Sequence, residues 1–199
     1  MTDVCMSARR ILIAAMAGAM LWSAGSAAQA RPASKGATAK PEPAAAASNS
    51  AEPTLIGQFG SWGAYMATPN GKRVCFVLAK PSSSKTTPPN RPRDPAYAFI
   101  STRPAEKVIN EVSVMIGYPL KPGSESTMEI GGASFAMYTQ GDGLWIKNAA
   151  EEDRLVEALR KGPEVTVKGV SAKGTATTDT FSLKGLAQAL DKVAQSCGG

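Results

Sequence analysis

Apolar and polar positions alternate through much of the chain after residue 53, and this pattern predicts short β-strands. In the segment Glu111–Tyr118 every second residue is apolar or aromatic: Val112, Val114, Ile116 and Tyr118. A period of two sends successive side chains to opposite faces of a strand, so this segment predicts a sheet with one buried face. Asn70 and Gly71 predict a tight turn before the strand Arg73–Ala79, because both residues accept positive φ.

Patterns of the same kind predict further strands, several of them separated by glycine-rich turns. These strands are expected at Leu55–Phe59, Gly63–Ala67, Tyr97–Ser101, Met128–Ile130, Ser134–Thr139, Leu144–Lys147, Glu164–Val170 and Thr175–Phe181. The segment Lys80–Pro95 is rich in Pro, Ser and Thr, and it is predicted to be a long exposed loop.

Two segments have the features of amphipathic helices. The first, Ala150–Lys161, begins with acidic residues and ends with basic ones, as the helix dipole favours, and Gly162 stops it. The second, Leu183–Cys197, has Ser182 as its predicted N-cap. Its apolar residues recur at helical spacing: Leu183, Leu186, Ala187, Leu190, Val193 and Ala194.

Strands outnumber helices, and no regular alternation of strands with helices predicts a parallel sheet. The expected fold class is mainly β: an antiparallel β-sandwich or flattened barrel with two helices, the second of them C-terminal. Residues 53–199 are expected to form one β-rich globular domain. Residues 31–52 contain no large apolar side chain and are predicted to be a disordered Ala/Pro-rich linker.

The first 30 residues have the parts of a secretory signal peptide. Two arginines precede the apolar run Ile11–Trp22, and the triplet Ala28–Ala30 matches the small-x-small motif of signal peptidase. Cleavage is therefore expected between Ala30 and Arg31. The apolar run is shorter than the roughly 20 residues that span a bilayer, so no permanent membrane anchor is expected after cleavage. An uncleaved membrane helix is the alternative.

Composition excludes several kinds of chemistry. The chain has no histidine, which excludes Ser-His-Asp catalysis, Cys-His catalysis and zinc sites with imidazole ligands. Three cysteines are too few for a cysteine-only zinc site, so no metal or cofactor is predicted. The net charge of +6 favours contact with anionic surfaces, although solubility alone would also explain it. Neither a P-loop nor a GxGxxG motif occurs, and no nucleic-acid partner is expected.

Two cysteines remain after residues 1–30: Cys75 and Cys197. An even number of cysteines in an oxidising compartment favours a disulfide. Cys197 lies four residues beyond Val193 on the apolar face of the last helix, and that face is expected to pack on the sheet that contains Cys75. A structural disulfide is predicted, with two separate buried thiols as the alternative.

Arg91, Arg93 and Arg103 are close in the sequence to Tyr97 and form a basic and aromatic cluster. Such a cluster is a candidate site for a polyanion or a carboxylate, and a solvated loop is the alternative. Two pairs of acids are candidates for glycosidase-like chemistry, with exposed sheet-edge acids as the alternative: Glu106 with Glu111, and Glu125 with Glu129. Three aromatic residues would suit a sugar platform if exposed and would otherwise be core: Trp62, Tyr65 and Trp145.

Four segments together resemble the invasion-associated locus B family of exported bacterial proteins: Gln58–Trp62, Cys75, Gly143–Trp145 and Phe181–Leu190. The most specific of them is the last, which reads FSLKGLAQAL. In the family a cysteine often follows the early tryptophan, whereas this chain has Tyr65–Ala67 there. The resemblance implies an all-β sandwich-like domain in the periplasm or on the outer membrane, linked in some pathogens to host-cell entry. It implies no catalytic residues.

These observations lead to a functional hypothesis. The chain is expected to be a periplasmic or cell-envelope protein, outer-membrane associated or secreted, that acts as a non-enzymatic binding module. The expected partner is another envelope protein or an anionic polymer. Two alternatives stay open: a host-directed adhesin or invasion factor, and a secreted hydrolase that uses paired carboxylates.

Overall fold

The structure, a computed structural model, describes residues 52–198. The predicted signal peptide over residues 1–30 and its cleavage site between Ala30 and Arg31 therefore lie outside the described residues. The predicted linker over residues 31–52 also lies outside them, except for Glu52.

Within residues 52–198, eleven antiparallel strands form a single sheet. In their order across the sheet they are β1 (Thr54–Phe59), β2 (Trp62–Ala67), β3 (Val74–Ala79), β5 (Tyr97–Arg103), β6 (Val108–Met115), β9 (Gly143–Ile146), β8 (Ala133–Gln140), β7 (Ser126–Ile130), β10 (Glu164–Val170), β11 (Ala176–Ser182) and β4 (Ser83–Thr87). Strands β1 and β4 are the two edges, so the sheet does not close into a barrel. The predicted antiparallel, mainly β fold is confirmed, and its strands belong to one open sheet.

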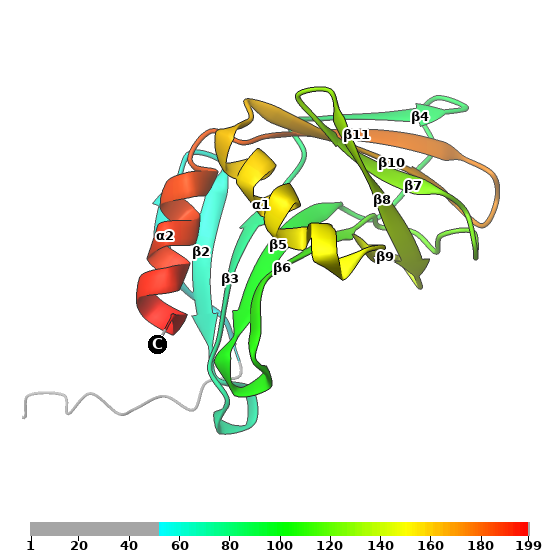
Figure 1. Cartoon of the computed structure of the whole chain (residues 1–199). Coiled ribbons are helices and arrows are strands. Elements are labelled where there is room, and N and C mark those ends of the chain that lie inside the picture. Colours follow the sequence, from blue (N-terminus) through cyan, green and yellow to red (C-terminus); the bar gives the residue numbers. More distant parts are fainter. Residues whose placement is uncertain (1–51, 199) are drawn as a thin grey trace, which may run out of the picture. The chain divides into compact units, whose positions relative to one another are not determined.

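In this described part of the chain, two α-helices complete the fold: α1 (Glu152–Lys161) and α2 (Leu186–Cys197). Figure 1 shows α2 alongside β2. It shows α1 in the angle between the half of the sheet that contains β2, β3, β5 and β6 and the half that contains β7, β10 and β11. One face of the sheet and the apolar faces of both helices share a single hydrophobic core. The predicted helix Ala150–Lys161 corresponds to α1 preceded by a 3₁₀ turn, Ala149–Glu151. The second helix is C-terminal, as predicted.

The alternating pattern places side chains on the two faces of the sheet as expected. In the segment predicted from period-two alternation, the residues Val112, Val114 and Ile116 are buried in the core. In β3, Cys75 and Val77 are fully buried, whereas Phe76 between them lies on the opposite, half-buried face. Because burial follows the period of the strand, these parts of the core could be read from the sequence.

The prediction of an exposed loop over Lys80–Pro95 is wrong in part, because this segment contains the edge strand β4. The strand consists of Ser, Lys and Thr, so no apolar alternation marks it in the sequence. Its backbone pairs with β11, where Ser84 lies opposite Asp179 and donates a hydrogen bond to its carboxylate at 2.7 Å. A polar edge strand of this kind is defined by the partner strand and not by its own pattern.

The prediction that Ser182 caps the second helix is also wrong. Ser182 is the last residue of β11, and α2 begins at Leu186 with Gly185 as its N-cap at a φ of 93°. A Cβ atom at Gly185 would lie 2.2 Å from the carbonyl oxygen of Phe59. The start of α2 is therefore set by the close passage of its first turn over the end of β1.

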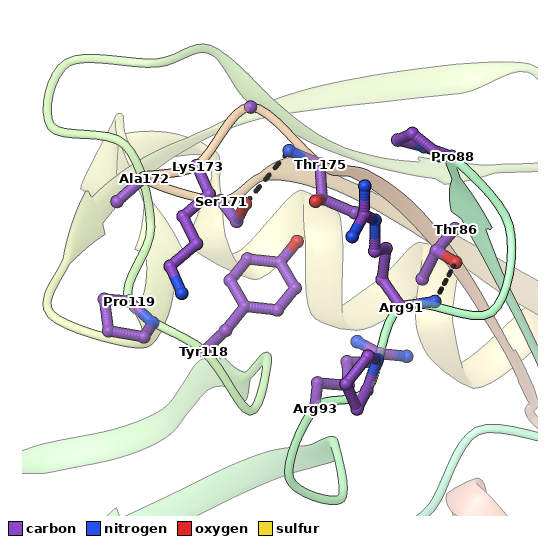
Figure 2. Close-up of a pocket in the computed structure, with 12 residues that line it drawn as sticks. Thr86, Pro88, Arg91, Arg93, Tyr118, Pro119, Ser171, Ala172, Lys173 and Thr175 are labelled. Atoms are coloured by element: carbon purple, nitrogen blue, oxygen red, sulfur yellow. Dashed lines mark hydrogen bonds between the residues drawn. The ribbon is translucent and has the colours of Figure 1, made fainter.

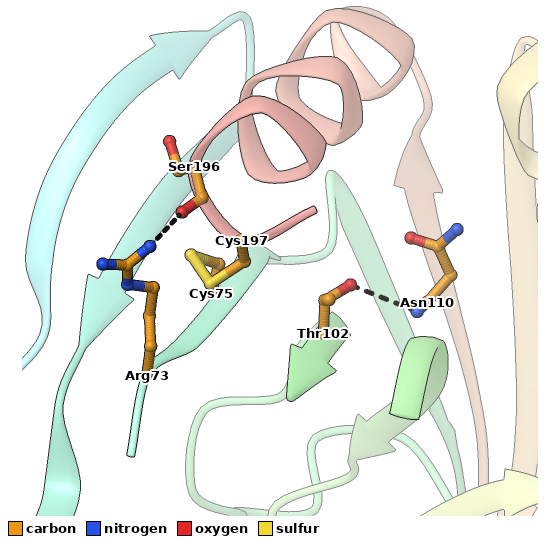
Figure 3. Close-up of a disulfide and its surroundings, with 6 residues drawn as sticks. All are labelled: Arg73, Cys75, Thr102, Asn110, Ser196 and Cys197. Carbon is orange, nitrogen blue, oxygen red and sulfur yellow. Dashed lines mark hydrogen bonds between the residues drawn. A yellow bond between two sulfur atoms is a disulfide. The ribbon is translucent and has the colours of Figure 1, made fainter. Parts of the chain in front are cut away.

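A disulfide joins Cys75 in β3 to Cys197 at the end of α2, as predicted from the helix face (Figure 3). The two Cα atoms are 5.9 Å apart, and both side chains are buried. Beside it, Arg73 donates a hydrogen bond to the backbone carbonyl of Ser196 at 3.2 Å. The last turn of α2 is thus fixed to the sheet by a covalent bond and by a polar contact.

Candidate functional site

The guanidinium of Arg93 and the carboxylate of Asp179 form a buried ion pair between the β4–β5 connection and β11. The Asp179 side chain is completely buried, and that of Arg93 is 10% exposed. Arg93 donates from Nη1 to Oδ2 of Asp179 at 2.7 Å and to the backbone carbonyl of Ile116 at 2.9 Å. Its Nη2 donates to Oδ1 of Asp179 and to the hydroxyl of Ser84. These four hydrogen bonds of the guanidinium are all made to residues of the folded domain.

A cavity of about 580 Å³ lies next to this ion pair. Its walls come from the end of β4 with the β4–β5 connection (residues 86–93), the β6–β7 connection (residues 118–119) and the β10–β11 connection (residues 171–175). Backbone hydrogen bonds hold two of these connections together, since Ala172 donates to Pro119 and Lys121 donates to Val170, both at 2.9 Å. The cavity is therefore built from segments that are distant in the sequence and rigidly joined.

Cationic side chains enter this cavity from two sides. In the view of Figure 2, the ring of Tyr118 lies between the ammonium end of Lys173 and the guanidinium of Arg91. Both cationic residues are exposed, and neither forms an ion pair with a carboxylate of the described residues. The rim of the cavity therefore has two positive charges that the described residues do not neutralise.

The polar groups of the cavity wall are oriented by the backbone. The hydroxyl oxygen of Thr86 accepts from the N–H of Arg91 at 3.2 Å, and that of Ser171 accepts from the N–H of Thr175 at 3.0 Å (Figure 2). Because each oxygen accepts a backbone hydrogen, the hydroxyl hydrogen of each side chain can be donated elsewhere. These residues can thus act as donors toward a bound group.

Tyr118 forms a neutral aromatic wall of the cavity. Burial raises the pKa of its hydroxyl to about 12, the positive charge of Arg93 opposes this rise, and the negative charge of Asp179 adds to it. The hydroxyl is in hydrogen-bond contact with the hydroxyl of Thr177. At physiological pH the side chain is therefore an uncharged phenol, unsuited to act as a base.

A second cavity, also of about 580 Å³, adjoins the first. The two cavities share four wall residues: Pro92, Arg93, Tyr118 and Pro119. The remaining wall of the second cavity includes Asp94 and Asp142. The two cavities therefore adjoin along shared proline and tyrosine side chains. Apart from Arg93, which lines both, the charged side chains of the first cavity are basic and those of the second are acidic.

The comparisons with known proteins agree with the resemblance found in the sequence. A family model described as invasion associated locus B (IalB) protein matches residues 62–194. The chain belongs to the invasion-associated locus B family. Comparisons with curated proteins and with solved structures find no match. The matched range includes all the residues that line the two cavities, and it contains Cys75 but ends before Cys197.

In this member of the locus B family, the predicted cluster of basic and aromatic residues is divided between two places. Arg91 and Arg93 line the first cavity, whereas Tyr97 and Arg103 are the first and last residues of β5. Arg103 binds Glu106 and Glu111, and its hydrogen bond to Glu111 raises the pKa of its guanidinium. Arg91 is thus the member of the predicted cluster whose charge stays available at the cavity.

The predicted acid pairs do not line either cavity. Glu106 and Glu111 are both bound to the guanidinium of Arg103, and Glu129 forms an ion pair with Lys168 at 2.8 Å. Glu125 is exposed in the connection before β7. These acids therefore lie in surface ion pairs or in solvent, and they do not converge on the candidate site.

The three candidate platform aromatics have different environments. Trp62 is core, 1% exposed, and its indole N–H donates to the carbonyl of Ser182 at 2.8 Å. Tyr65 stacks on Phe76, and Trp145 stacks on Tyr138, all on the face of the sheet opposite the core. Trp62 is therefore not part of a surface platform.

Sequence reasoning missed Lys173 and Tyr118 as parts of one site. The detectable signals were weak: Tyr118 precedes Pro119, and Lys173 lies in a short polar turn.

Within residues 52–198, neither helix is long and apolar enough to cross a membrane. The same residues provide no cluster of three His, Cys, Asp or Glu side chains suited to hold a metal ion.

Proposed function

We propose that this locus B family member is an exported, non-enzymatic protein of the cell envelope that binds an anionic group of a partner. The observation that carries the proposal is the position of Arg91 and Lys173 at the rim of the first cavity, without carboxylate partners among the described residues. An envelope protein with an acidic segment, or an anionic envelope polymer, would supply the missing negative charge.

The chemistry of the cavity suits an anion. A guanidinium forms paired hydrogen bonds with carboxylate or phosphate oxygens, and an ammonium adds a compact positive charge. The hydroxyls of Thr86 and Ser171 are oriented so that they can donate to the same group. Binding of this kind needs no movement of the framework, since the connections around the cavity are already hydrogen-bonded together.

Binding explains the cavity better than catalysis does. The residues that line the first cavity include no carboxylate and no thiol. Its phenol, Tyr118, has a pKa raised to about 12, which makes it a weak candidate for a general base near neutral pH. The locus B family is not a known enzyme family. These points support the assignment of the site to recognition.

Two further observations support export. The residues before Arg31 have the pattern of a cleavable signal peptide, and the Cys75–Cys197 disulfide is of the kind that persists in oxidising compartments. The intact mass of the protein purified from its native cell envelope tests this part. We expect a chain that starts at Arg31 and lacks two hydrogens relative to the reduced form; a full-length chain with free thiols would contradict export.

The binding site can be tested with poly-L-glutamate as the anionic probe. The affinity of residues 31–199 for this polymer is measured by fluorescence anisotropy at low and at physiological salt. We expect the double variant Arg91→Ala/Lys173→Ala to bind at least about tenfold more weakly, because two charge-assisted contacts are lost.

The matched control is the double variant Lys147→Ala/Lys184→Ala, which loses the same net charge at exposed positions outside both cavities. Its affinity at physiological salt is expected to stay within about twofold of the unmodified protein, because long-range attraction is then screened over roughly 8 Å. Equal losses in the two variants would show that the polymer responds to net charge, and the proposed site would be wrong.

A further inference from the structure

The two cavities adjoin along lining residues that they share. Pro92 and Arg93 form part of one side of both cavities, and Tyr118 and Pro119 form part of another. Each cavity has a volume of about 580 Å³, so the two together can hold several residues of a peptide chain. We refer to the two cavities together as the Tyr118 groove.

The second half of the Tyr118 groove has a fixed backbone frame. Asp94 donates from its N–H to the carbonyl of Gly117 at 3.0 Å, and Ile116 donates to the carbonyl of Asp142 at 2.9 Å. Gly117 has a φ of +80°, and a Cβ atom there would lie 2.0 Å from the carbonyl oxygen of Asp94. The close approach of these segments therefore requires glycine and holds both aspartates at the same cavity.

The charges of the Tyr118 groove are separated by sign. Arg91 and Lys173 line the first cavity, and Asp94 and Asp142 line the second. Asp94 and Asp142 are exposed and form no ion pair with the other described residues. Arg93 lies between the two ends, but its charge is compensated by the buried carboxylate of Asp179. The groove is thus positive at one end and negative at the other.

The wall between the charged ends is apolar and rigid. It consists mainly of prolines and the neutral ring of Tyr118, and Pro88 extends it within the first cavity. Aromatic side chains that line a groove suit polyproline II peptides, whose preformed backbone has little conformational entropy to lose. A compact anion would fill the first cavity alone and would leave the second cavity empty.

We infer that the occupant of the Tyr118 groove is an extended peptide segment with an acidic group at one end and a basic group at the other. The acidic group binds between Arg91 and Lys173, the basic group binds near Asp94 and Asp142, and the apolar middle lies against Tyr118 and the prolines. The inference rests on the proposed function, because its acidic end uses the same cavity. Beyond the proposed function, it adds a subsite for a cationic group, and it states which end of the bound peptide lies in which cavity.

Four capped peptides test the inference: acetyl-Glu-Pro-Pro-Lys-amide, the acid-only Glu-Pro-Pro-Gln, the base-only Gln-Pro-Pro-Lys, and the neutral Gln-Pro-Pro-Gln. Affinities are measured by calorimetry, and contacts are located by amide chemical-shift changes. We expect the dipolar peptide to bind at least about tenfold more tightly than the acid-only peptide. Versions with one or three additional prolines vary the distance between the two charged ends, because a polyproline II chain rises by about 3.1 Å per residue.

The variant Asp94→Asn/Asp142→Asn isolates the new subsite. It is expected to reduce the affinity for the dipolar peptide to that for the acid-only peptide and to leave the acid-only affinity unchanged. The control Glu125→Gln/Glu164→Gln removes two exposed charges that line neither cavity of the groove, and it is expected to change neither affinity. This pair of variants separates a local contact from a change in net charge.

The outcomes separate the two proposals. If the acid-only peptide binds through Arg91 and Lys173 but the added lysine gives no gain, the dipolar groove is wrong and the anion site stands. If no acidic peptide or polymer binds at Arg91 and Lys173, the proposed function fails, and the inference fails with it. A gain from the lysine that persists in Asp94→Asn/Asp142→Asn would place the cation elsewhere and would also overturn the inference.

Discussion

Arg91 and Arg93 are two residues apart in the sequence, yet their guanidinium groups have different roles because their burial differs. Arg93 is enclosed and bonded to Asp179, Ser84 and a backbone carbonyl, so its charge stabilises the packing of β4 against β11. Arg91 is exposed at the rim of the cavity and forms no ion pair with the described carboxylates. Residue type alone could not separate the structural arginine from the candidate binding arginine.

Loss of the Asp179 carboxylate should strongly destabilise the fold. In Asp179→Asn the charge of Arg93 stays buried without its counter-ion, and such losses cost about 3–5 kcal/mol. The free energy of unfolding in urea measures the change. Asp191→Asn is the matched control, because Asp191 binds Arg160 at the surface, where a pair contributes less than about 1 kcal/mol. Similar losses in the two variants would contradict the structural role of the buried pair.

Glu152 should make stability depend on pH in a predictable direction. Burial raises the pKa of its carboxyl group, the hydrogen bond from the N–H of Val112 opposes the rise, and Glu111 and Asp153 add to it. A raised pKa means that the contribution to stability is present below the ordinary carboxyl pKa and is lost as pH rises through the folded value. The unfolding free energy of the unmodified protein should therefore fall relative to Glu152→Gln as pH rises above the ordinary carboxyl pKa of about 4.

Glu157 provides a control of opposite sign for this measurement. The hydrogen bond from Lys161 lowers the pKa of the Glu157 carboxyl group. The contribution of a group with a lowered pKa is present above its ordinary value and is lost as pH falls. Relative to Glu157→Gln, the unmodified protein should therefore lose stability as pH falls below the ordinary carboxyl pKa of about 4, and it should show no change at higher pH. Equal trends in the two comparisons would rule out the assigned causes.

The elements differ in how visible they are in the sequence. Strands with one buried face, such as β3, were predicted because their side chains alternate with the period of the sheet. Strand β4 was missed because its five residues are polar and its pairing depends on the backbone of β11. The start of α2 was misplaced because a contact between Gly185 and β1, distant in the sequence, determines it.

Variants of two glycines can distinguish the free-energy cost of crowding between Gly185 and the end of β1 from the cost of the left-handed backbone conformation. Gly132 and Gly185 have similar φ values, +87° and +93°, but a Cβ atom at Gly132 would meet nothing within 4 Å. We expect Gly132→Ala to cost about 1–2 kcal/mol of unfolding free energy for the backbone conformation alone. Gly185→Ala should cost about 1–3 kcal/mol more, because its Cβ atom meets the Phe59 carbonyl. Urea unfolding of both variants measures the difference.

At the scale of the whole domain, the disulfide closes a very long loop. Cys75 and Cys197 are 122 residues apart, so in the unfolded state the bond restricts the conformations of most of the domain's chain. In the chain-entropy model, removal of such a bond costs at most about 5 kcal/mol. We expect Cys75→Ala/Cys197→Ala to keep the fold with a lower urea midpoint, and hydrogen exchange to increase first in the last turn of α2. Unchanged stability would contradict this role.

The sequence by itself determined the class of the fold, the family, the cysteine pair and most of the strands. These properties depend on local periodicity and on residue types, and both can be read from each segment of the sequence by itself. The tertiary structure decided which charges are used internally and which are available, because burial depends on contacts between distant segments. It also created the candidate site, where Arg91, Tyr118 and Lys173 come from three connections joined by backbone hydrogen bonds. Backbone bonds between loops leave no periodic pattern in the sequence, so this arrangement could be found in the folded chain alone.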